Sequence, residues 1–270
     1  MPEPAGISHA NRAYLEQLHR ADGGPLSVGD ASEILGLDRE RTARLLGYLA
    51  RRGWLSRVRR GLYVPVPLDA RRSGEWTADA WIVAERVFSP CYIGGWSACE
   101  HWDLTEQLFR VVLVVTAKRV RERDVEMQGV AFHLTVRDPG ALFGTVAVWR
   151  GRERVMISDP TRTIVDVLDD PRLGGGIRNV SNVLGEYLVS EFRDDQLLIT
   201  YGDRLGRRAV FKRLGYLVEQ LGVDADDLVA ACRERLTAGV IALDPAVKVR
   251  GRIVRRWGLR DNIAVSQVAT

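Results

Sequence analysis

The sequence predicts an α+β fold: an N-terminal group of short helices with a β-hairpin, then a mixed α/β region, then a mainly helical C-terminal part. Three observations lead to this prediction. Apolar residues recur at helical spacing in the first fifty residues, and after Gly53 the pattern changes to short extended runs. Runs rich in β-branched and aromatic residues fill the middle of the chain. Apolar stripes at helical spacing return after Gly176.

Three helices are expected before Gly53. The first runs from His9 to Ala21, and a Gly-Gly-Pro segment ends it. The second begins at Ser27, in a Ser-x-x-Asp pattern close to a capping box. The third has Asp38 as its N-cap and continues through Arg52. The residues expected to face the core are Val28, Ala31, Ile34 and Leu35 in the second helix and Ala43, Leu46 and Leu49 in the third.

A hairpin follows these helices. Two short extended runs, Trp54–Val58 and Leu62–Val64, flank an Arg-Arg-Gly turn. Three short helices followed by a hairpin, within about sixty residues, is the order of a winged helix-turn-helix. We therefore expect residues 1–66 to form such a domain.

Arginines gather where this fold would touch DNA. Between Asp38 and Tyr63 there are eight arginines and only two acidic residues. The first residues of a recognition helix enter the major groove, where arginine reads guanine, and a wing contacts phosphate. A solvated face in an arginine-rich protein, or a protein-binding winged helix, is the alternative. The predicted DNA-binding residues are Ser27, Arg39, Arg41, Thr42, Arg44, Arg57, Arg59 and Arg60.

Residues 67–74 are predicted to be a linker, and residues 75–270 a second domain. In its first half we expect a helix at Thr77–Val87, another near Ser97–Trp102, and a third from Asp159 through Leu168. Asp159 is expected to be the N-cap of that helix. The predicted strands are Phe109–Thr116, Val130–Val136, Thr145–Trp149 and Arg154–Ile157.

The C-terminal part carries three apolar stripes at helical spacing, followed by a last helix at about Ala225–Leu236. The end of the chain, Val247–Arg260, is expected to be extended and is strongly basic. Two interpretations of this segment stay open: a second contact to DNA or a partner, and a solvated terminal strand.

Composition limits the class of protein. The chain has 270 residues with 46% hydrophobic residues, enough for two globular domains with real cores. No signal peptide is recognised at the N-terminus. The longest strongly apolar stretch, Val111–Val115, is far short of the roughly 20 residues that span a bilayer. Three irregularly spaced cysteines imply no disulfide framework, so we expect a cytoplasmic protein without membrane contact.

No active site is predicted. None of the three lysines has an acidic residue two positions before it, as a restriction-like nuclease needs. A paired aspartate at Asp224 and Asp226 lacks the Gly-Ser turn of a nucleotidyltransferase. Asp159 and Asp166 share a helix face, but Asp166 is better explained as the partner of Arg162 at i−4. We expect no enzyme activity, no metal and no cofactor.

A set of motifs in a fixed order resembles a known family. They are the hairpin from Gly53 to Val66, the segments Tyr92–Ala98 and Ser158–Asp166, Pro171 with Gly174 and Gly175, and Arg213–Leu217. In this order, over about residues 9–236, the chain is similar to the AbiEi antitoxins of type IV toxin–antitoxin systems.

The resemblance implies an N-terminal domain that represses its own operon by binding double-stranded operator DNA, expected to carry inverted repeats. It implies a C-terminal domain that counters a nucleotidyltransferase toxin encoded nearby. Two other functions stay open: a one-component transcription factor with a ligand-sensing C-terminal domain, and a nucleic-acid enzyme with a winged-helix targeting module.

Overall fold

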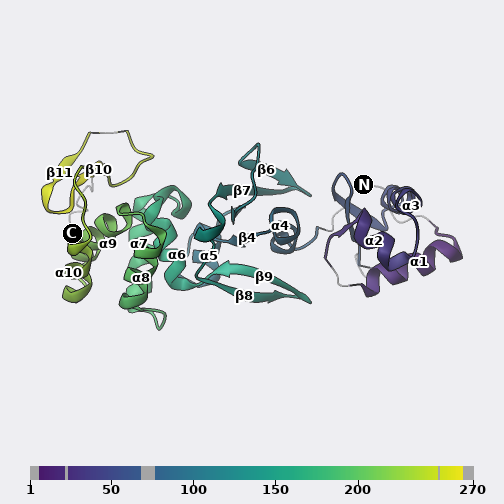
Figure 1. Cartoon of the computed structure of the whole chain (residues 1–270), viewed down its shortest axis with the longest axis horizontal. Coiled ribbons are helices and arrows are strands. Elements are labelled where there is room, and N and C mark those ends of the chain that lie inside the picture. The colour runs from purple at the N-terminus through teal and green to yellow at the C-terminus, as the bar shows by residue number, and fades with distance from the viewer. Residues whose placement is uncertain (1–5, 22–23, 68–76, 249, 264–270) are drawn as a thin grey trace. The chain divides into compact units, whose positions relative to one another are not determined.

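The computed structural model describes residues 6–21, 24–67, 77–248 and 250–263. These residues form a mixed α+β structure with ten α-helices and three β-sheets (Figure 1). The expected linker at residues 67–74 lies, apart from Pro67, outside the described residues, and the predicted domain boundary stays a prediction.

Two compact units are present, and each is made of several chain segments. Unit 1 contains residues 1–91, 110–136 and 147–156, and unit 2 contains residues 92–109, 137–146 and 157–270. The division cuts strands β4 (Cys91–Ile93), β8 (Thr145–Arg150) and β9 (Glu153–Ser158), so it differs from the simple N-terminal and C-terminal parts that the sequence predicts.

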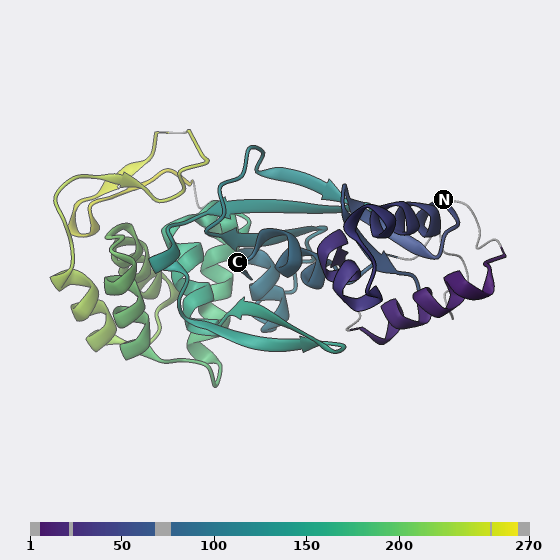
Figure 2. The ribbon, with the colours of Figure 1, turned by 45° about the vertical axis from the view of Figure 1, so that its right-hand side comes forward.

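Unit 1 begins with three helices and a small sheet. The helices are α1 (His9–Arg20), α2 (Val28–Leu35) and α3 (Arg39–Arg51). Strands β1 (Leu26–Ser27), β2 (Leu55–Arg59) and β3 (Leu62–Pro65) form an antiparallel sheet in the order β1-β3-β2. This arrangement, drawn in purple and dark blue in Figure 2, is consistent with a winged helix-turn-helix.

These N-terminal elements have a core of their own. Leucines from all three helices and from β2 pack together, and Ala31 of α2 lies among them. The fully buried members of this core are Leu18, Ala31, Leu46, Leu49 and Leu55. Each helix therefore buries one apolar stripe and leaves its opposite side to solvent.

Strands β4 to β9 form a six-stranded sheet in the order β6-β7-β5-β4-β9-β8. β5 (Val111–Thr116) pairs with β7 (Val130–Val136) in parallel, and β6 (Asp124–Met127) pairs with β7 in an antiparallel hairpin. β4 is Cys91–Ile93, β8 is Thr145–Arg150 and β9 is Glu153–Ser158. Strands β4 and β6 were not predicted from the sequence. Both are short, and β6 is polar with little burial.

Two helices belong with these strands. α4 (Ala80–Phe88) lies in unit 1 and has Asp79 as its N-cap. The helix begins at Ala80, three residues after the predicted start at Thr77. α5 (Gly95–His101) lies in unit 2, close to its predicted place.

Unit 2 is built around α6 (Pro160–Asp169). Helices α7 (Ile177–Val189), α8 (Asp195–Leu205), α9 (Ala209–Leu221) and α10 (Asp226–Glu234) complete the helical part, as the apolar stripes predicted. The largest buried core of the described residues combines side chains of α6, α7, α8, α9 and α10. Arg213 of α9 holds the C-terminal end of α6, because its buried guanidinium donates to the carbonyl oxygens of Leu168 and Asp169 at 2.8 and 2.9 Å.

The basic C-terminal segment is partly extended, as expected. β11 (Arg252–Val254) and β12 (Leu259–Asp261) pair antiparallel, and β10 (Ile241–Ala242) joins β12 in parallel. Between β11 and β12 a short 3₁₀ turn places Trp257 against α9, where it is fully buried. The segment is therefore anchored to the fold by an aromatic side chain, while Arg250 and Arg252 stay exposed.

Candidate nucleic-acid interface

Helix α3 begins at a well-formed N-cap. The Asp38 Oδ1 atom accepts a hydrogen bond from the backbone N–H of Arg41 at 2.8 Å, as the sequence predicted. This cap fixes the first turn of α3, which carries Arg39 and Arg41 of the predicted contact residues. A negative side chain at this end also complements the positive end of the helix dipole.

The buried face of α3 differs by one residue from the predicted face. Thr42, Leu46 and Leu49 have no exposed surface, whereas Ala43 is exposed. The Thr42 hydroxyl donates to the carbonyl oxygen of Asp38 at 2.8 Å, which satisfies its polar group inside the core. The prediction that Ala43 faces the core is therefore wrong. Thr42 cannot reach DNA from this position, so it is removed from the predicted contact residues.

The arginines of α3 lie on its exposed side. Arg39, Arg41 and Arg44 are all exposed. Arg44 forms an ion pair with Glu40, one turn earlier, with 2.6 Å between its Nη1 and the Glu40 Oε1. Both side chains are highly exposed, at 69% and 80%, so the pair adds little to stability. Glu40 is not among the contact residues predicted from the sequence, although its i, i+4 spacing to Arg44 is a signal for this ion pair.

The hairpin of β2 and β3, which would be the wing of a winged helix-turn-helix, presents the remaining predicted arginines. Arg57, Arg59 and Arg60 are exposed, while Val58 between them is buried. A register shift between Arg57 and Arg59 interrupts the pairing of β2 with β3. Gly61 closes the turn with a φ of 77°, a left-handed conformation that favours glycine. Two arginines therefore lie at the tip of the hairpin, beside this glycine.

Ser27 has a structural role that the sequence identified. Its Oγ atom accepts from the backbone N–H of Asp30 at 3.1 Å, and the Asp30 carboxylate accepts from the Ser27 N–H at 2.9 Å. These two bonds complete a capping box at the start of α2. Ser27 is only half-exposed, and its contact with DNA stays a prediction.

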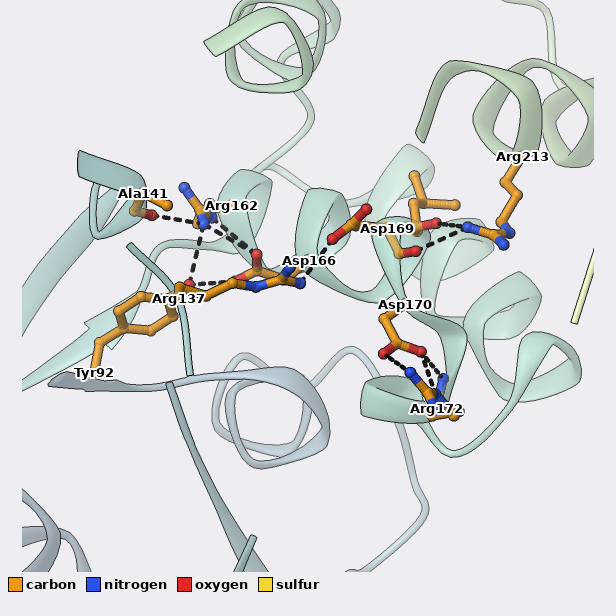
Figure 3. A network of polar contacts seen from close by, with 10 residues as sticks. Tyr92, Arg137, Ala141, Arg162, Asp166, Asp169, Asp170, Arg172 and Arg213 are labelled. Atoms are coloured by element: carbon orange, nitrogen blue, oxygen red, sulfur yellow. Dashed lines mark hydrogen bonds and ion pairs between the residues drawn. The ribbon is translucent and has the colours of Figure 1, made fainter. Parts of the chain in front are cut away.

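The carboxylates on α6 belong to a buried network (Figure 3). Asp166 accepts from the Arg162 Nε at 3.1 Å and from the Tyr92 hydroxyl at 2.7 Å. Arg162 also donates to the carbonyl oxygen of Ala141 at 2.9 Å. Asp166 and Arg162 are almost completely buried, and burial raises the pKa of Asp166. The predicted pairing of Arg162 with Asp166 is confirmed.

Asp159 is confirmed as the N-cap of α6. Its Oδ1 atom accepts from the backbone N–H of Arg162 at 2.7 Å, and its Oδ2 atom accepts from the Tyr201 hydroxyl at 2.9 Å. The carboxylates of Asp159 and Asp166 are thus both occupied by hydrogen bonds within the fold.

The cysteines are buried thiols. Burial raises the pKa of Cys99 and of Cys232 to about 12 and raises that of Cys91 further. Such thiols stay protonated at neutral pH and are poor nucleophiles. Among the described residues, no group of three histidine, cysteine or acidic side chains is placed to hold a metal ion. Within the same residues, no helix is long and apolar enough to cross a bilayer.

Comparison with known proteins identifies the N-terminal part. A family model described as "Transcriptional regulator, AbiEi antitoxin" matches residues 14–66. No curated protein matches the chain. The matched segment runs from the middle of α1 through the hairpin, so it contains α2, α3 and the wing. The resemblance of this chain to the AbiEi antitoxin regulators is therefore confirmed, and it rests on residues 14–66.

Proposed function

We propose that the chain is a DNA-binding transcriptional repressor of the AbiEi antitoxin type. The main support for this proposal is that the family match and the exposed arginines occur in the same segment of the chain. The residues that match the AbiEi regulator model also carry the exposed arginines of α3 and of the wing. An exposed, arginine-rich helix beside an arginine-tipped hairpin suits a duplex, since a helix fits the major groove and a wing reaches phosphate.

The arginines divide into two roles in this proposal. Arg39, Arg41 and Arg44, in the first half of α3, read base edges in the operator. Arg59 and Arg60, at the tip of the wing, bind phosphate and carry no sequence information. Ser27 and Arg57 flank these groups and are assigned to the backbone contacts. A dimer on an operator with inverted repeats would place two copies of α3 in successive major grooves.

Residues 75–270 are proposed to counter a nucleotidyltransferase toxin encoded beside this gene. Support for the antitoxin role comes from the ordered motifs between Tyr92 and Leu217, which resemble the same family whose model matches residues 14–66. Support for a non-enzymatic role comes from Asp159 and Asp166, whose carboxylates are both used in structural hydrogen bonds. Groups that are buried and already hydrogen-bonded are poorly suited to bind a metal or a substrate. The proposed role of these residues is therefore non-enzymatic.

A ligand-sensing role for residues 75–270 has weaker support. A surface hollow of about 420 Å³ lies beside the start of α7, with Asp244 and Asn262 among its lining residues. Its polar groups are already used by the fold: Asp244 accepts from the N–H of Ile177 at 2.9 Å, and the Asn262 amide donates to the Asp244 carbonyl at 2.7 Å. A ligand would have to break these bonds in order to bind there.

The DNA-binding half of the proposal is tested with the full chain and a duplex taken from upstream of its own gene. The triple variant Arg39→Ala/Arg41→Ala/Arg44→Ala should lose sequence-specific binding, measured by fluorescence anisotropy at several salt concentrations. The triple variant Arg119→Ala/Arg121→Ala/Arg123→Ala removes the same charge from other exposed positions and should bind normally. Equal binding by both triple variants would refute the assignment of α3.

The antitoxin half is tested by growth. Co-expression of this chain should relieve the toxicity of the neighbouring nucleotidyltransferase-like gene product. The α3 triple variant should rescue growth as well as the wild type does, because rescue is assigned to residues 75–270. If the wild-type chain gives no rescue although it binds its promoter, it is a regulator without antitoxin activity.

A further inference from the structure

Glycines in the middle of helices usually need a reason, because glycine destabilises a helix relative to alanine. Two helices of unit 2 supply clear reasons. A Cβ atom on Gly202 of α8 would lie 2.7 Å from the Phe211 ring, and one on Gly215 of α9 would lie 2.0 Å from the Trp257 ring. At these positions a neighbouring side chain occupies the space that a larger residue would need.

Gly185 of α7 and Gly47 of α3 have no such neighbour. A Cβ atom on Gly47 would meet only the Arg51 Nη1 atom, at an ordinary contact distance of 3.7 Å. Gly47 is half-exposed and takes no left-handed backbone conformation. Within the described part of the chain, therefore, neither packing nor backbone geometry requires a glycine at this position.

The place of Gly47 on α3 gives it a different meaning. Residues 40, 44, 47 and 51 follow the i, i+4, i+7, i+11 spacing of one helix face. This face lies opposite the buried stripe of Thr42, Leu46 and Leu49. The row therefore contains Glu40, Arg44 and Arg51, all exposed, with a position without a side chain between the two arginines.

We propose that Gly47 is the position at which α3 comes closest to DNA. This inference rests on the proposed function and deepens it, since it states how far the helix enters the major groove. The groove is about 12 Å wide, and a helix with its side chains is about 10–12 Å across. Any side chain at the centre of the inserted face therefore limits the depth of insertion.

Without a side chain at residue 47, the helix backbone lies directly against the edges of the base pairs. Arg44 and Arg51, one turn to either side, then reach bases and phosphates on both sides of this contact. Gly47 destabilises the free helix, but in the complex it allows the flanking arginines to reach the DNA.

The test compares Gly47→Ala and Gly47→Leu with Gly185→Ala in the full chain. Gly185 is the matched control: it is half-exposed in the middle of α7, and its Cβ atom would meet only Leu221, at 3.8 Å. The probe is a duplex selected by the wild-type chain from a random double-stranded pool. Affinity and thermal unfolding midpoint are measured for each variant.

Gly47→Ala should raise the unfolding midpoint and yet weaken binding, and Gly47→Leu should weaken binding by about tenfold or more, the size of one lost base-pair contact. Gly185→Ala should raise the midpoint and leave binding unchanged. Wild-type affinity in both Gly47 variants would overturn the inference and leave the proposed DNA binding intact. Failure of the wild-type chain to select any sequence would instead overturn the proposed function, and the inference with it.

Discussion

At the scale of single residues, Glu40 is the acidic side chain that faces outward from the proposed DNA-contacting helix. It lies in the same row as Arg44 and Arg51 and forms an ion pair with Arg44. In a complex its carboxylate would lie near phosphates and repel them, while it accepts readily from the amino group of cytosine. If the chain binds DNA as proposed, we expect Glu40 to favour specific over non-specific binding.

We expect Glu40→Gln to tighten binding to unrelated DNA. The difference in affinity between the selected duplex and unrelated DNA should therefore become smaller. The effect on unrelated DNA should be on the order of 1 kcal/mol at low salt, the size of one screened charge interaction near 4 Å. Glu186→Gln, an exposed substitution on α7 with the same change in charge, is the control. The measurement is a pair of dissociation constants, for the selected and for a scrambled duplex. Uniformly weaker binding to both would mean that Glu40 only positions Arg44.

Single residues also show where sequence reasoning about the candidate site stops. The charged positions of α3 and of the wing could be predicted, because arginine, aspartate and glycine are strong local signals. The burial of Thr42 in place of Ala43 could not be predicted from the sequence, because neither residue is strongly apolar. Only the bond from the Thr42 hydroxyl to the Asp38 carbonyl makes a threonine acceptable in the core.

At the scale of elements, α9 depends on its contact with the C-terminal segment. Gly215 leaves room for the Trp257 ring, and the Trp257 indole donates to the Glu219 carboxylate at 2.8 Å. We expect Gly215→Ala to lower the free energy of unfolding by about 1–3 kcal/mol, the usual range for overpacking. Gly185→Ala should stabilise the chain by up to about 1 kcal/mol. Urea unfolding followed by tryptophan fluorescence measures both, and equal stability in the two variants would contradict this packing.

A second element-scale prediction concerns alkaline pH. The Tyr216 hydroxyl on α9 donates to the Asp261 carboxylate of β12 at 2.9 Å. Two effects raise the pKa of Tyr216 from its ordinary value of 10.0 to about 12. Burial is the larger effect, and the hydrogen bond to Asp261 is the second. Between about pH 10 and 12, the Tyr216 hydroxyl therefore keeps its proton in the folded chain and loses it in the unfolded chain. The stability that Tyr216 contributes is complete below about pH 10 and is lost as the pH rises from 10 to 12.

Tyr216→Phe should therefore destabilise the chain by about 1 kcal/mol at pH 8, the value of one hydrogen bond. The difference between the variant and the wild type should shrink as the pH approaches 12. Unfolding free energies at several pH values between 8 and 12 measure this, and a constant difference across the range would mean that the bond to Asp261 does not govern the titration.

The elements differ in how well the sequence predicted them. Strongly periodic helices such as α7 and α9 were predicted, and so were the caps at Asp38 and Asp159, because their signals are local. Strand β6 was missed because it is short and polar and is defined only by its pairing with β7. The burial of Trp257 was missed for the same kind of reason, since it depends on a gap at Gly215, more than forty residues earlier.

At the scale of the whole molecule, the sequence predicts a single domain boundary at residues 67–74. The structure instead divides into two compact units, each made of several chain segments. The linker expectation at residues 67–74 depends on local composition, which cannot show that unit 1 also contains residues 110–136 and 147–156. A pattern along the chain reports elements, whereas a compact unit is defined by contacts between distant segments. The predicted boundary therefore needs a physical test.

We expect residues 75–270 to fold as a fragment. The largest buried core of the described residues lies wholly within this fragment, and so do all the strands of the six-stranded sheet. Residues 1–67 have a separate core of leucines from α1, α2, α3 and β2, although a domain of this size is marginal in stability. Circular dichroism and cooperative unfolding of each purified fragment measure whether it folds.

Function should divide between the two fragments in the same way. Residues 75–270 should relieve the toxicity of the neighbouring gene product without binding the promoter, because the arginines of α3 and of the wing are absent from this fragment. Residues 1–67 should bind the promoter, more weakly than the full chain, and should give no rescue. A soluble, cooperative fragment 75–270 without rescue would favour the ligand-sensing alternative. Rescue by residues 1–67 alone would overturn the proposed division, because it would place the antitoxin activity in the segment that matches the regulator model.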